Sequence, residues 1–120
     1  MGTFHRSIRI AKAGGSEFIE LRALVDSGAA YSWVPGSILK RIGAEPKVRR
    51  KFTIADGSVL ERDVAEVSFR IDSETLTTFA IFGDEGSEPL LGALTLEQFA
   101  LGVDPVNRRL IPVTLPEASI

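Results

Sequence analysis

The amino-acid sequence predicts one mostly β domain with one or two short helices. Three observations predict this fold class: long stretches alternate apolar and polar residues, turn residues separate these stretches, and helix signals are few. Alternation with a period of two is typical of half-buried antiparallel strands. A chain of 120 residues is one domain long, so we expect residues 1–120 to form a single domain around one core.

The alternation predicts two hairpins. Residues 4–10 and 18–25 are expected to pair, because Gly-Gly-Ser at 14–16 allows the backbone conformations of a tight turn. Residues 65–71 and 75–82 have the same pattern around three polar turn residues and form the second pair. The core-facing residues of the first pair should be Phe4, Ile8, Ile10, Ile19, Leu21, Ala23 and Val25.

A third hairpin is expected between these two. Asp56-Gly57 is a strong turn signal and predicts a hairpin tip within residues 52–59. The basic residues 47–51 precede this tip. We interpret them as a charged edge strand that resists aggregation, the alternative being a patch that attracts an acidic substrate or RNA.

Two short segments carry helix signals. Residues 37–42 are followed by Gly43 and residues 93–101 by Gly102, and glycine tolerates the left-handed conformation that ends many helices. We therefore expect two brief helices that end at these glycines. From Pro112 onward the chain is expected to form a loose tail.

The composition excludes several kinds of function. Fourteen Lys and Arg stand against sixteen Asp and Glu, so no overall basic field favours a nucleic-acid partner. The absence of Cys and the single His exclude a thiol nucleophile, a cysteine zinc site and a multi-histidine metal centre. We predict no metal and no cofactor. No apolar run has the length of a signal peptide core or a membrane span, so a cytoplasmic location without membrane contact is expected.

The strand at 18–25 ends in Asp26-Ser27-Gly28-Ala29, which places a carboxylate at the end of a buried strand. A carboxylate there is costly unless it is hydrogen-bonded or has a chemical purpose. One interpretation is an ordinary turn in which Asp26 accepts hydrogen bonds from backbone amides. The other interpretation is a catalytic acid, and the surrounding sequence favours it.

Residues 24–35 read Leu-Val-Asp-Ser-Gly-Ala-Ala-Tyr-Ser-Trp-Val-Pro and resemble the signature of the aspartic proteases, two hydrophobic residues followed by Asp, Ser or Thr, and Gly. A second signature of that superfamily, two hydrophobic residues and a glycine before a short helix, is matched by Leu90-Leu91-Gly92. Residues 52–59 lie where the family has its flap, and residues 101–112 are similar to the end of bacterial retropepsin-like domains. The resemblance covers about residues 18–112.

This resemblance implies a small closed β-barrel-like acid protease fold of the retropepsin type, and an aspartic endopeptidase acting on peptides or unfolded protein. Amide hydrolysis without a metal or a covalent nucleophile needs two carboxylates, one to deprotonate water and one to donate a proton. The chain has a single Asp-Ser-Gly, so we expect a homodimer in which the two catalytic Asp26 side chains face each other. The other implied roles are active-site support for Ser27, Gly28 and Ala29, a substrate-binding flap for Ala55, Asp56, Gly57 and Ser58, and a structural motif for Leu90, Leu91 and Gly92.

The same sequence is compatible with other interpretations. A non-catalytic dimeric peptide-binding or regulatory module would keep the same fold, and a processing domain excised from a larger precursor is a third possibility. The hairpin tip is either a flap or a solvent-facing turn, and Tyr31 and Trp33 either line substrate subsites or belong to the core and its rim. Ala29 lacks the hydroxyl that pepsins have at this position, so we expect activity at mildly acidic to near-neutral pH.

Overall fold

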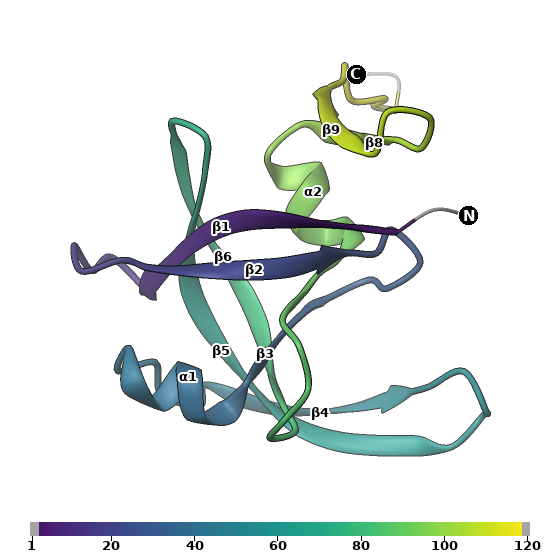
Figure 1. Ribbon diagram of the computed structural model, residues 1–120. Coiled ribbons are helices and arrows are strands. Elements are labelled where there is room, and N and C mark those ends of the chain that lie inside the picture. Colours follow the sequence, from purple (N-terminus) through teal and green to yellow (C-terminus); the bar gives the residue numbers. More distant parts are fainter. Residues whose placement is uncertain (1–2, 119–120) are drawn as a thin grey trace.

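The computed structural model describes residues 3–118 and is shown in Figure 1. Within this range the chain forms nine strands and two short helices. The strands are β1 (Phe4–Lys12), β2 (Ile19–Val25), β3 (Ser32–Pro35), β4 (Val48–Thr53), β5 (Val59–Ile71), β6 (Glu74–Gly83), β7 (Leu90–Leu91), β8 (Leu101–Asp104) and β9 (Arg109–Pro112). The helices are α1 (Gly36–Arg41) and α2 (Ala93–Gln98).

Six of these strands close into a barrel. They follow the order β1-β2-β7-β3-β6-β5, and β5 pairs back onto β1 to complete the ring. Most pairings are antiparallel, but β7 runs parallel to β2, and β3 runs parallel to β6. Closure leaves the barrel strands without free edges, and the predicted mostly β, closed-barrel fold is confirmed.

The first predicted hairpin is present with the expected faces. In β1 and β2, Phe4 lies opposite Val25 and Ile10 lies opposite Ile19, and the turn between them contains Gly14 with a φ of +74°. The predicted core-facing residues of this pair are buried, apart from the half-buried Ile19, while Arg9, Glu20 and Arg22 are exposed and Arg6 is half-buried. The barrel core contains Phe4, Ile8, Ile10, Leu21, Ala23, Val25, Val34, Ala65, Val67, Phe69, Ile71, Ala80 and Leu91.

The second predicted hairpin is also present, but its first strand is longer than expected. Strand β5 begins at Val59, so one continuous strand pairs with β4 near the hairpin tip and with β6 and β1 in the barrel. Strand β4 pairs with β5 alone and lies at the edge of the sheet, as predicted for the basic residues 47–51. The β4–β5 hairpin therefore projects from the barrel in Figure 1.

The first helix ends as predicted, but the prediction for the second helix is wrong. Helix α1 is followed by Gly43 with a φ of +83°. Helix α2 ends at Gln98, and Ala100 with a φ of +52°, not Gly102, has the left-handed conformation after it. Gly102 lies in β8, where a Cβ atom would come within 2.7 Å of the Val113 side chain. Close strand packing, and not a helix end, requires glycine here.

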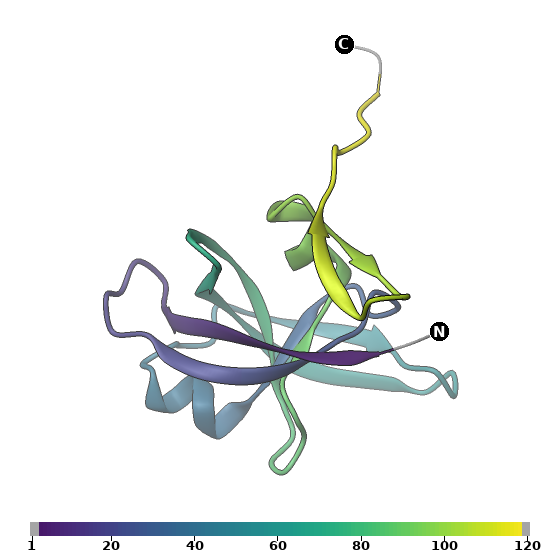
Figure 2. The same ribbon diagram turned by 45° about the horizontal axis from the view of Figure 1, so that its top comes forward.

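Strands β8 and β9 form a separate two-stranded sheet that lies above α2 in Figure 1. Beyond β9, residues 113–118 have no regular secondary structure, as expected for the tail, and Figure 2 shows this segment leading away from the barrel. Neither helix of the described chain has the length and apolar character needed to cross a membrane.

Candidate active site

The Asp26 loop begins where β2 leaves the barrel. The amide of Leu24 donates to the carbonyl of Pro89 at 2.9 Å, and the amide of Asp26 donates to the carbonyl of Leu91 at 3.0 Å. These bonds continue the parallel pairing of β2 with β7 as far as Asp26 itself. The backbone of Asp26 is thus held by the sheet, and the turn starts only after it.

The turn is closed by the Asp26 carboxylate. Its Oδ1 atom accepts a hydrogen bond from the amide of Gly28 at 2.9 Å, and a Cβ at Gly28 would lie 3.1 Å from that same oxygen. The carbonyl of Asp26 accepts from the amide of Ala29 at 3.2 Å. Within residues 3–118 the Oδ2 atom makes no hydrogen bond. Asp26 is half-buried and Ser27 and Gly28 are exposed, so the free oxygen, the hydroxyl and the glycine backbone are open to a second molecule.

The Leu90-Leu91-Gly92 segment contacts the backbone of this loop through Gly92. A Cβ on Gly92 would lie 2.4 Å from the carbonyl oxygen of Tyr31 and 3.0 Å from that of Ala29, so only glycine fits. The first amides of α2 then hold the loop, since Ala93 donates to the Ala29 carbonyl at 2.7 Å. The structure therefore brings the two sequence motifs together as one rigid unit.

Two buried hydroxyls complete this unit and were missed by the sequence analysis. The Ser32 hydroxyl lies 2.6 Å from that of Thr95 and accepts a hydrogen bond from the amide of Gly92 at 3.0 Å. Both side chains are only 1% exposed. A signal was present in the sequence, because Ser32 and Thr95 are each flanked by apolar or aromatic residues in elements that bury one face.

Removal of one hydroxyl tests this network. Ser32→Ala should lower the free energy of unfolding by about 1–3 kcal/mol, because the Gly92 amide loses its acceptor and the Thr95 hydroxyl loses its partner in a buried site. Urea denaturation measures the change. Ser7→Ala in the exposed face of β1 is the matched control, and an equal effect of the two substitutions would contradict the role given to Ser32.

The tip of the β4–β5 hairpin is ordered by its own residues. The amide of Ile54 donates to the carbonyl of Ser58, and the amide of Gly57, with a φ of +86°, donates to the carbonyl of Ile54, both at 2.9 Å. The hydroxyl and the amide of Ser58 both donate to Asp56 Oδ1 and hold the pKa of that carboxyl below its ordinary value. Residues 55–58 are all exposed.

The pH response of this tip follows from the lowered pKa of Asp56. The turn is stabilised by the ionised carboxylate, so its stabilisation is complete above the ordinary Asp pKa of about 4 and is lost as the pH falls through the lowered value. The amide shift of Ser58, followed by NMR, should therefore titrate below that of an ordinary Asp. Asp56→Asn should remove the titration, and a midpoint at or above the ordinary value would contradict the assignment.

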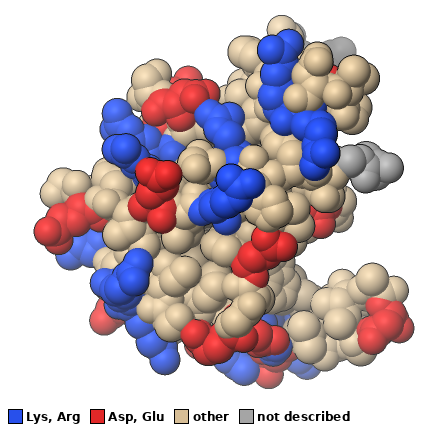
Figure 3. Space-filling view, viewed as in Figure 1, with Lys and Arg blue, Asp and Glu red and all other residues tan. Residues whose placement is uncertain are grey.

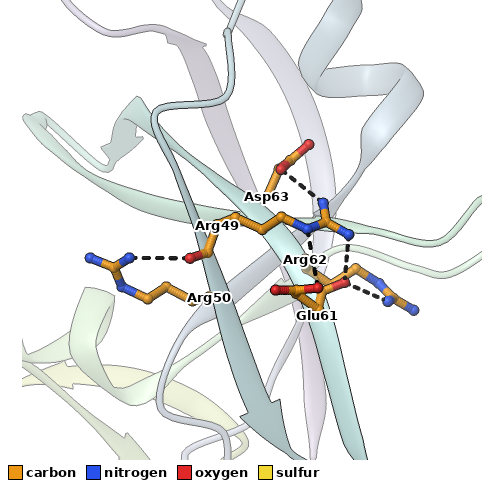
Figure 4. A network of polar contacts seen from close by, with 5 residues as sticks. All are labelled: Arg49, Arg50, Glu61, Arg62 and Asp63. Carbon is orange, nitrogen blue, oxygen red and sulfur yellow. Dashed lines mark hydrogen bonds and ion pairs between the residues drawn. The ribbon is translucent and has the colours of Figure 1, made fainter.

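Ion pairs along the hairpin join its two strands. The Arg49 guanidinium contacts Asp63 at 3.0 Å and Glu61 at 3.5 Å on β5, as Figure 4 shows, and the hydrogen bond to Asp63 raises the pKa of Arg49 further. Lys47 pairs in the same way with Glu66 at 2.8 Å. The acids of β5 thus pair with Lys47 and Arg49, while Arg50 and Lys51 make no ion pair within the described residues, and this partial neutralisation weakens the alternative of an RNA or acidic-substrate patch.

The Asp26 loop and the tip of the hairpin lie on the same side of the molecule in Figure 1. Figure 3 shows the end of the hairpin as a separate lobe with an open hollow between it and the part of the molecule above. A separate pocket of about 520 Å³ lies beside the Asp26 loop. Tyr31, Phe79, Leu94 and Leu115 form part of its lining, but Asp26 does not. Among the described residues, no three His, Cys, Asp or Glu side chains are grouped to hold a metal ion.

Comparison with known proteins agrees with this geometry. The sequence profile of a family described as aspartyl protease matches residues 10–95, a span that contains the Asp26 loop, the hairpin and Leu90-Leu91-Gly92. The chain belongs to this aspartyl protease family. Among the curated proteins, none matches it.

Solved structures of this kind share the fold. A retropepsin-like aspartic protease from Rickettsia conorii superposes with a TM-score of 0.57 at 20% identity, covering 86% of this chain and 88% of that one. EIAV protease, solved with an inhibitor, gives 0.58 at 19% identity, with 82% and 88% covered. The protease of simian foamy virus (mac) gives 0.54 at 18% identity, with 78% and 94% covered. The predicted retropepsin fold is thus confirmed for this family member.

Proposed function

We propose that this protein is a homodimeric aspartic endopeptidase that hydrolyses peptides or unfolded protein segments. The observation that carries the proposal is the Asp26 carboxylate, which is fixed by the Gly28 amide on one oxygen and leaves the other oxygen free at an exposed loop. One chain supplies one such carboxylate. A two-fold dimer that brings the loops together supplies the pair that metal-free hydrolysis requires.

In the dimer, one Asp26 carboxylate takes a proton from water while the other, protonated, donates to the scissile carbonyl. Aspartic proteases are the standard example of two carboxylates that share one proton, because two like charges in close contact do not both ionise. The shared proton alone makes the two subunits unequal. The attacking water becomes part of a tetrahedral intermediate that then releases the amine.

The neighbouring residues have supporting roles in this proposal. The exposed Ser27 hydroxyl donates across the dimer axis, and the Gly28 carbonyl accepts a substrate N–H where no side chain blocks the approach. The hairpin tip, residues 55–58, forms the flap that closes over the peptide and excludes water. The hollow between this tip and the Asp26 side of the molecule supports that role (Figure 3).

Digestion of a random peptide pool tests the function. The purified protein should cleave peptides at mildly acidic to near-neutral pH and be blocked by a pepstatin-type inhibitor, while Asp26→Asn should not cleave. Identical behaviour of the two proteins would reject the enzyme and leave a dimeric peptide-binding module. Cleavage that resists the inhibitor but is lost in Asp26→Asn would keep the mechanism with an unusual subsite shape.

A further inference from the structure

Three aromatic side chains meet where the segment after the Asp26 loop comes close to the end of β4 nearest the hairpin tip. Phe52 of β4 contacts Tyr31 with a ring-centroid distance of 5.5 Å and an interplanar angle of 71°. It also contacts Trp33 of β3 at 5.7 Å and 58°. All three side chains are half-buried. Tyr31 and Trp33 closely follow Asp26 in sequence, so this contact joins the hairpin to the segment that leaves the Asp26 loop.

Most polar interactions of the hairpin join residues of the hairpin to one another. Arg49 of β4 pairs with acids of β5 (Figure 4), as does Lys47 just before β4, and the tip is closed by Asp56 and Ser58. An ion pair between Arg62 and Asp84, at 3.1 Å, leads out of the hairpin, but the Asp84 side chain is 73% exposed. Exposed ion pairs hold a structure weakly. The aromatic contact is therefore an apolar connection between β4 and the segment after the Asp26 loop.

The geometry of this contact suits it to fix the orientation of the hairpin relative to β3. Aromatic rings prefer edge-to-face arrangements, and a ring in contact with two others has little freedom to slide. A two-stranded hairpin is marginally stable without such support. Because Phe52 pairs with Leu60 close to the turn, residues 54–58 follow it almost directly, and a shift of Phe52 is passed on to the tip.

We propose that Phe52 is a positioning residue that holds the flap over the Asp26 loop through its contacts with Tyr31 and Trp33. The proposal rests on the proposed function, because a flap has a task only when substrate lies beneath it. It adds a determinant outside the Asp26 loop and outside the hairpin tip. Phe52 acts on the reaction through the position of the tip and is not itself assigned a catalytic step.

Fluorescence of the free protein tests the contact. Trp33 and Tyr31 are the only Trp and Tyr of the chain, so tryptophan emission reports on this cluster alone. In Phe52→Ala, Trp33 emission should shift to the red and its acrylamide quenching should rise by about twofold, because an apolar neighbour is replaced by water. Val59→Ala in the same hairpin is the matched control, since Val59 is 60% exposed. Unchanged Trp33 emission in Phe52→Ala would overturn the proposal.

Cleavage kinetics separate positioning from a merely structural role. Phe52→Ala should raise KM for a cleaved peptide by about tenfold with kcat nearly unchanged, because loss of two aromatic contacts weakens closure of the flap on bound substrate. Phe52→Tyr should restore KM. A fall in kcat at constant KM, or no rescue by Phe52→Tyr, would overturn the proposal. If the unaltered protein cleaves no peptide, the proposed function fails, while the Trp33 comparison still decides the contact.

Discussion

Asp26→Asn is expected to lower kcat/KM by roughly 10²–10⁴-fold while leaving the fold intact, because the amide neither takes a proton from water nor shares one with its twin. The side-chain oxygen of Asn still accepts from the Gly28 amide, so the turn that Asp26 closes at 2.9 Å is kept. Peptide cleavage measures the activity, and circular dichroism with thermal unfolding checks the fold. An active Asp26→Asn protein would reject Asp26 as the catalytic acid.

Mixing the two proteins tests whether the active site is shared between subunits. With a tenfold excess of Asp26→Asn, exchange of subunits should lower the activity of the original chains by about tenfold, because nearly all of them then pair with a variant. Excess Glu45→Gln, a surface substitution expected to remain active, is the matched control, and the total activity should then rise in proportion to the protein added. Activity that survives the Asp26→Asn excess would show a monomeric site and refute the paired mechanism.

Gly92→Ala adds one methyl group and is expected to lower the free energy of unfolding by about 2–4 kcal/mol. We expect no other single methyl group added near the site to be as damaging. The added Cβ would lie 2.4 Å from the Tyr31 carbonyl oxygen and 2.6 Å from its carbon. Both are backbone atoms, so neither moves away without shifting the Asp26 loop. Activity should fall together with stability, and urea denaturation with peptide cleavage measures both.

Gly36→Ala is the matched control for this substitution. Its Cβ would meet the nearest atom, Cδ2 of Phe82, at 3.5 Å, which is ordinary van der Waals contact, and Gly36 lies in α1, where alanine is favoured. We expect little change in the free energy of unfolding. If Gly92→Ala were tolerated as well as Gly36→Ala, close packing of Gly92 against the loop would be wrong.

The sequence predicted the parts of the site that depend on local chemistry. Asp26 follows an apolar strand and precedes a glycine, and this pattern alone indicates a carboxylate at the start of a turn. The turn interpretation is confirmed, because Oδ1 accepts from the Gly28 amide, while Oδ2 makes no hydrogen bond within residues 3–118 and the catalytic role of Asp26 stays a prediction. The Asp56-Gly57 tip was equally predictable, since its hydrogen bonds join residues close in sequence.

The limits of prediction appear where contacts are distant in sequence. The pattern predicts that the second helix ends at Gly102, whereas α2 ends at Gln98, because the contact between Gly102 and Val113 cannot be read from the local sequence. The Ser32–Thr95 hydrogen bond likewise joins residues that no periodicity relates. The dimer and the role of the flap stay predictions.

The sequence by itself determined the mostly β class, the hairpin turns and the carboxylate at position 26, because alternation and turn chemistry act over a few neighbouring residues. Tertiary structure alone decided that β5 pairs with β1 to close the barrel, that Gly92 packs against the backbone of the Asp26 loop, and that Phe52 lies on Tyr31 and Trp33. These contacts depend on how the closed sheet curves, and curvature is a property of all its strands together.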